Sequence, residues 1–187
     1  MKFFTILAAI LLFASLAQAQ IKSNAAIQQQ IRTLGSDASI TVSYDTSSNV
    51  TTLRAVSDNF PSDEEKRAGV RAINFAAGAL YVGNGLEKSP EPILLTFWVL
   101  SSKPRFAEDH TLTVFTIDET LQIGDSRYVA RARDGMEYLN FNLTRGQLKK
   151  IATQSSVKLH LGRNEFNLTK SQLKLLADLY LATEVSK

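Results

Sequence analysis

The feature that most constrains the fold is a repeat near the C-terminus. Residues 141–149 read FNLTRGQLK, and residues 166–174 read FNLTKSQLK. Each copy has the pattern of a strand end, then a threonine that can cap a helix, then the first turns of an amphipathic helix. Two copies are too few for a solenoid, so we expect two strand–helix steps within one larger fold.

The segment between the two copies predicts a further hairpin. Residues 157–161 alternate apolar and polar side chains, which is the period of a half-buried strand, and residues 162–164 supply a turn. The C-terminal part of the chain therefore predicts the order strand, helix, strand, strand, helix. We expect this β-α-β-β-α unit to pack on a larger sheet.

The preceding part of the chain predicts that sheet. Three pairs of segments have the pattern of β-hairpins: residues 38–44 with 50–56, 112–117 with 120–123, and 127–132 with 138–142 around an Asp134-Gly135 turn. Residues 93–100 are almost all β-branched, aromatic or leucine, which predicts a central strand buried on both faces. The expected fold class is α+β: a mainly antiparallel, sandwich-like β-sheet with the C-terminal unit packed on it.

The secondary structure of residues 64–82 stays open at this level. A capping-box pattern at Ser62 and Glu65 favours a helix. One face of that helix would carry Val70, Ile73, Ala77 and Leu80. The alternative is a strand, one face of which would carry Arg71, Ile73, Phe75 and Ala77. The glycines in this segment weaken both interpretations.

The N-terminus has the three regions of a cleavable secretory signal. Lys2 supplies a positive charge, residues 3–16 form an apolar run, and the small-x-small tripeptide 17–19 ends it. The run is shorter than the ~20 apolar residues that a membrane-spanning helix needs. We expect cleavage between Ala19 and Gln20. The chain would then divide into a signal peptide (residues 1–19), a polar lead-in (20–37) and a single α+β domain (38–187).

The chain contains no cysteine. An exported domain that could form disulfides but has none must be held together by its apolar core. The lack of cysteine also excludes lipid attachment after the expected cleavage site, and no second long apolar run predicts a transmembrane segment in the mature chain. We therefore expect a soluble bacterial protein of the periplasm or the medium.

Several motifs resemble those of uncharacterised exported bacterial proteins. The matching motifs are Ile151-Ala152-Thr153, Val157-x-Leu159-x-Leu161-Gly162 and Phe166-x-Leu168-Thr169-x-x-Gln172-Leu173. The apolar strand at residues 94–98 and an Asp-led hairpin near Asp118 belong to the same resemblance, which covers residues 38–182. The resemblance favours a strand over residues 70–82. It implies no activity, because none is assigned to such proteins.

Side chains suited to catalysis or metal binding are few. The nitrogen ligands available for a metal are His110 and His160, and neither a zinc-binding HExxH motif nor an EF-hand spacing occurs. Ser155 and Lys158 match the S-x-x-K motif of penicillin-recognising enzymes, but this serine follows a predicted helix instead of opening one. We expect no metal, no cofactor and no catalytic residue.

The formal net charge is mildly positive, +3 from 21 Lys and Arg against 18 Asp and Glu. Three arginines, Arg127, Arg131 and Arg133, fall on one face of a predicted strand. With Lys149, Lys150, Lys158 and Arg163 they predict a cationic surface that could bind an anionic lipid, a polysaccharide or an acidic envelope protein. The plainer interpretation is a solvated face that protects an edge strand. Nucleic acid is not expected, because the compartment is wrong and no aromatic stacking platform is visible.

The sequence has the patterns that specify strands, helices and an apolar core, but few reactive side chains. This combination favours a non-enzymatic binding or scaffolding module of the bacterial cell envelope. The alternative is a small exported hydrolase whose site is assembled from dispersed polar residues. A pocket in which His110 or His160 bonds both a carboxylate and a serine would favour the hydrolase. A convex, pocket-free surface with an exposed sheet face would favour the binding module.

Overall fold

The computed structural model describes residues 40–83, 85–86, 92–131 and 133–184. The expected signal peptide, its cleavage site between Ala19 and Gln20, and the polar lead-in lie outside the described residues.

The described strands form two antiparallel sheets, one of six strands and one of four. The larger sheet has the order β1 (Ile40–Asp45), β2 (Val50–Val56), β3 (Ala72–Val82), β4 (Ile93–Leu100), β8 (Met136–Leu143) and β7 (Arg127–Arg131). The smaller sheet has the order β10 (Asn164–Asn167), β9 (Lys158–Leu161), β5 (Thr111–Phe115) and β6 (Thr120–Asp125). The helices in the described residues are α2 (Ser62–Ala68), α3 (Arg145–Ala152) and α4 (Lys170–Glu184). The expected α+β, sandwich-like fold is confirmed.

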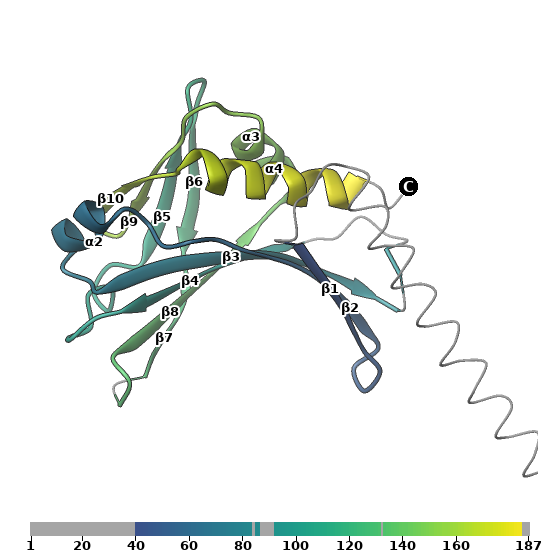
Figure 1. Ribbon diagram of the computed structural model, residues 1–187, viewed down its shortest axis with the longest axis horizontal. Coiled ribbons are helices and arrows are strands. Elements are labelled where there is room, and N and C mark those ends of the chain that lie inside the picture. The colour runs from purple at the N-terminus through teal and green to yellow at the C-terminus, as the bar shows by residue number, and fades with distance from the viewer. Residues whose placement is uncertain (1–39, 84, 87–91, 132, 185–187) are drawn as a thin grey trace, which may run out of the picture.

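The core lies between the larger sheet and the layer that covers it. In Figure 1, α4 crosses above the curved larger sheet, and α3 and the smaller sheet lie on the same side. Phe75 and Phe97 extend from the larger sheet into this space, where they meet Val114 of the smaller sheet, Leu148 of α3 and Leu176 of α4. Since the chain has no cysteine, burial of such apolar side chains is the main stabilising contribution.

β4 is a central strand, but only one of its faces is buried. Its neighbours are β3 and β8. The core receives Ile93, Leu95, Phe97 and Val99, whereas Leu94, Thr96 and Trp98 on the other side stay partly exposed. The expectation of burial on both faces is therefore wrong. The helices cover one side of the larger sheet, and none of the described elements covers the other (Figure 1).

Residues 64–82 contain both structures that the sequence left open. α2 ends before Gly69, which adopts the left-handed conformation (φ 69°) common at helix ends, and β3 begins at Ala72. The expected capping box is absent: the N-cap is Pro61, and the Glu65 carboxylate accepts a hydrogen bond from the Ile73 N–H. The helical interpretation of the second half of this segment is wrong, and the strand interpretation is confirmed.

The two copies of the C-terminal repeat adopt the same local structure. The N–H groups of Gln147 and Gln172 donate to the hydroxyls of Thr144 and Thr169, at 3.1 and 3.2 Å. The glutamine side-chain oxygens accept from the threonine N–H groups in return. This reciprocal capping explains why each FNLT segment leads into a helix. The order β8, α3, β9, β10, α4 is confirmed, and β9 pairs with β5 in the smaller sheet.

Candidate functional site: the outer sheet face

The face of the larger sheet that is turned away from α4 is here called the outer face. Because side chains alternate along a strand, it receives every second residue of each strand. These include Arg54 of β2, Gly78 of β3, Leu94 and Trp98 of β4, and Tyr138 of β8. Register makes Arg54 the neighbour of Gly78, Gly78 the neighbour of Leu94, and Trp98 the neighbour of Tyr138.

A groove of about 430 Å³ is hollowed into the outer face. Ala76 and Gly78 form its floor, since small side chains on the middle strand leave room between the larger ones of β2 and β4. A β-carbon added to Gly78 would lie only 3.0 Å from the carbonyl oxygen of Leu53. The face is therefore exposed but not pocket-free, in contrast to the convex surface that we expected of a binding module.

Two arginines lie over aromatic rings of this face. The guanidinium carbon of Arg54 lies 5.8 Å from the ring centroid of Trp98, and that of Arg131 lies 5.4 Å from the ring centroid of Tyr138. Both distances are within the range of cation–π attraction. Because Trp98 and Tyr138 are cross-strand neighbours, the four side chains form one line from β2 to β7. We call this line the arginine–aromatic row.

The charge of the outer face is positive. Arg54, Arg127 and Arg131 all lie on it, and none of them forms an ion pair with a described carboxylate. An acidic side chain on the same face is Asp45, at the end of β1. Its carboxylate accepts hydrogen bonds from Ser47 and Ser48, which lower the Asp45 pKa to about 2. That carboxylate is therefore engaged within its own turn.

The structure places two of the three predicted arginines on the outer face. Arg127 and Arg131 both lie on β7 with their side chains exposed. The prediction that Arg133 shares this strand face is wrong, because β7 ends at Arg131. The turn to β8 begins there: the Asp134 N–H donates to the Arg131 carbonyl oxygen, and Gly135 has a φ of 63°.

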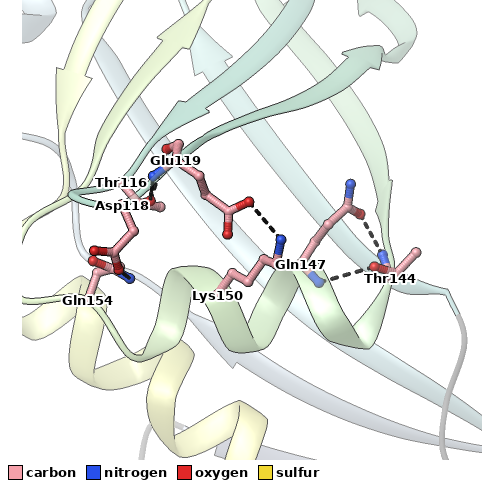
Figure 2. Close-up of polar contacts among 7 residues, drawn as sticks. All are labelled: Thr116, Asp118, Glu119, Thr144, Gln147, Lys150 and Gln154. Carbon is pink, nitrogen blue, oxygen red and sulfur yellow. Dashed lines mark hydrogen bonds and ion pairs between the residues drawn. The ribbon is translucent and has the colours of Figure 1, made fainter.

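The C-terminal cations do not extend this surface. Lys150 pairs with Glu119 at 2.7 Å, and Asp118 of the same turn accepts a hydrogen bond from Gln154 at 3.1 Å. Figure 2 shows how these contacts join the β5–β6 turn to α3 and to Gln154, which follows α3. In the smaller sheet Lys158 pairs with Glu165 at 3.1 Å, and beside it Arg163 pairs with Glu108 at 3.7 Å. These residues lie on the covered side of the larger sheet and have carboxylate partners, whereas Lys149 is exposed on α3.

The histidines have separate partners. Nδ1 of His110 lies 3.3 Å from the Ser126 hydroxyl, and the His110 ring stacks on Tyr128 at 5.5 Å. Nε2 of His160 lies 2.7 Å from a Glu165 oxygen. Neither histidine contacts both a serine and a carboxylate among the residues described. Over the same residues, no group of three or more His, Cys, Asp or Glu side chains could hold a metal ion.

A buried carboxylate fixes the edge of the sheet that carries Arg131. Glu137 of β8 is 1% exposed, and its carboxylate accepts hydrogen bonds from the N–H groups of Arg105 and Phe106, both at 2.9 Å. The hydroxyls of Ser101 and Tyr128 also donate to it. Burial, and then the bond to Glu137, raise the pKa of Tyr128 to about 12. These hydrogen bonds connect β8 to β7, through Tyr128, and to the loop that contains Ser101, Arg105 and Phe106.

Arg54, Trp98 and Tyr138 were not expected as members of a site. The alternation of each strand does place them together, because each of the three stands between two buried residues of its strand and so points to the other face. Alternation within a strand does not predict which strands become neighbours, and the arginine–aromatic row depends on that strand order.

Searches against family models, curated proteins and solved structures find no match for this chain. The resemblance to uncharacterised exported bacterial proteins therefore stays a prediction. No helix in the described part of the chain is long and apolar enough to cross a membrane.

Proposed function

We propose that the protein is an exported binding or scaffolding module of the bacterial cell envelope that holds an anionic partner on its outer face. The observation that carries this proposal is the arginine–aromatic row, in which Arg54 and Arg131 lie over rings without a described carboxylate partner. A guanidinium group presents N–H donors in a planar fork that matches a carboxylate or phosphate group.

Stacking on the rings favours binding energetically. A flexible side chain that becomes ordered on binding costs free energy. Arg54 and Arg131 are already restrained by Trp98 and Tyr138, so less rotamer freedom is lost when an anion binds. Arg127, which pairs with no described carboxylate, adds a third positive charge on the same face and would speed the encounter with an anionic surface.

A non-enzymatic role is supported by the dispersal of the reactive side chains. His110 contacts a serine, His160 contacts a carboxylate, and neither histidine is among the described residues that line the groove. A hydrolase would need these groups within hydrogen-bond reach of one another. Export is supported by the signal pattern of residues 1–19 and is part of the proposal.

Charge reversal on β7 tests this function. The variant with Arg127→Glu and Arg131→Glu should lose most of its retention on a support that carries the acidic fraction of a bacterial envelope extract. The reason is that two attractive charges become repulsive on the same face. Retention is measured by elution with increasing salt, and thermal unfolding checks that the variant is folded.

The matched control reverses two exposed cations away from the outer face, Lys149→Glu and Arg163→Glu, and changes the net charge equally. It should be retained almost like the wild type. Equal loss in both variants would mean that retention follows net charge alone, and no loss in either would contradict the proposed function.

A further inference from the structure

The groove differs from the rest of the outer face because its lining is mostly apolar. It is lined by Leu80, Leu94, Trp98, Met136 and Tyr138 beside the small residues of its floor. Leu80 is 53% exposed and Leu94 is 37% exposed, which is costly for large apolar side chains that meet only water. Its volume of about 430 Å³ is in the range of small-molecule sites.

Exposed apolar side chains gather on this face of the molecule. Among the described residues, the large apolar side chains that are exposed are Val56, Leu80, Val82, Leu94, Ile117, Val129 and Leu181. Five of these seven, all except Ile117 and Leu181, stand at outward positions of the larger sheet. Such a concentration on one face is typical of a binding surface.

Among the described residues that line the groove, Arg54 is the one that carries a charge. Its guanidinium group reaches across β3 to the ring of Trp98, and no described residue accepts a hydrogen bond from it. The groove thus combines an apolar trough with one cation at its side. A ligand complementary to it has an apolar body and one negative charge.

We propose that the groove binds an anionic amphiphile, a molecule with an alkyl chain and one carboxylate. The chain lies over Ala76 and Gly78 against Leu94, and the carboxylate pairs with the guanidinium group of Arg54. This inference rests on the proposed function and names the ligand class of the same face. An acidic sugar fits less well, because the hydroxyl donors in the described part of the lining are Thr52, Thr96 and Tyr138, and Thr96 already donates to Asn140.

The test uses Trp98 as its own reporter, because it is the single tryptophan of the chain. Dodecanoate, titrated below its micelle concentration, should change the emission of Trp98 in a saturable way. Dodecyltrimethylammonium has a similar chain with the opposite charge, and glucuronate has the charge without the chain. Both should bind at least about tenfold more weakly, since each lacks one of the two interactions.

Two variants test the charge of Arg54 and the apolar floor of the groove separately. Arg54→Gln should weaken dodecanoate binding by about tenfold, because a neutral amide replaces a charge-assisted hydrogen bond. Ala76→Leu keeps Arg54 but fills the floor, and should weaken dodecanoate to a similar extent. Arg163→Gln, outside the larger sheet, should bind like the wild type. Calorimetry repeats each titration, since Arg54→Gln also alters the surroundings of Trp98.

The inference is overturned if dodecanoate fails to bind, if glucuronate binds as tightly, or if both groove variants bind dodecanoate like the wild type. In each of these cases the retention experiment with Arg127 and Arg131 can still succeed, and the proposed function would stand with a different ligand. If the retention experiment fails while dodecanoate binds as expected, the proposed envelope partner is rejected, and the proposal that the groove binds an anionic amphiphile stands.

Discussion

At the scale of single residues, the most consequential polar side chain is buried and does not touch the groove. A buried carboxylate costs free energy unless hydrogen bonds replace the water that it loses. Glu137 meets this condition with two backbone N–H groups and two hydroxyls. It lies opposite Ala130 of β7 and directly precedes Tyr138, so it stabilises the strands that bear half of the arginine–aromatic row.

Replacing Glu137→Gln should lower the free energy of unfolding by about 2–3 kcal/mol, because an amide NH₂ then faces buried donors that have lost their acceptor. Urea unfolding measures this effect. The comparison variant is Glu119→Gln, which removes the exposed pair with Lys150 and should cost less than about 1 kcal/mol. Equal and small losses in the two variants would contradict the structural role given to Glu137.

At the scale of elements, the reciprocal caps explain how the repeat generates two helices. α4 covers the core side of the larger sheet, so the stability of its first turn matters for the whole fold (Figure 1). Leu173, Leu176 and Leu179 on this helix are all buried. The cap at Thr169 supplies an acceptor for a helix N–H that otherwise lacks one.

Replacing Thr169→Ala should lower the free energy of unfolding by about 1 kcal/mol, and Thr169→Ser should restore most of it, because serine keeps the hydroxyl acceptor. Thermal unfolding of the three proteins measures the difference. A loss that serine does not restore would mean that packing of the threonine methyl group, not capping, is responsible.

The elements could be predicted because they depend on local patterns. Alternation located the hairpins, and the FNLT repeat located both C-terminal helices. The uncovered face of β4 could not be predicted, since Leu94 and Trp98 have the same apolar character whether they face a core or a groove. The groove itself depends on the register of β2, β3, β4 and β8, and a slip of one residue would move every outer side chain to the core.

At the scale of the whole molecule, charge and apolar surface are unevenly distributed. The helices and the smaller sheet cover one side of the larger sheet and pair several of their cations, among them Lys150 and Lys158. On the outer face, Arg54, Arg127 and Arg131 stand beside a groove with few charges. The outer face is therefore clearly positive, although the net charge of the whole chain is only +3.

The central claim is that this outer face is the binding surface, and hydroxyl-radical footprinting tests it most directly. The protein is labelled with and without the acidic fraction of an envelope extract, and mass spectrometry measures the labelling of each side chain. We predict that Trp98, Met136 and Tyr138 become protected, while Phe115 of the smaller sheet and Tyr180 of α4 are labelled as before. Protection of Phe115 and Tyr180 with unchanged labelling of the outer face would contradict the claim.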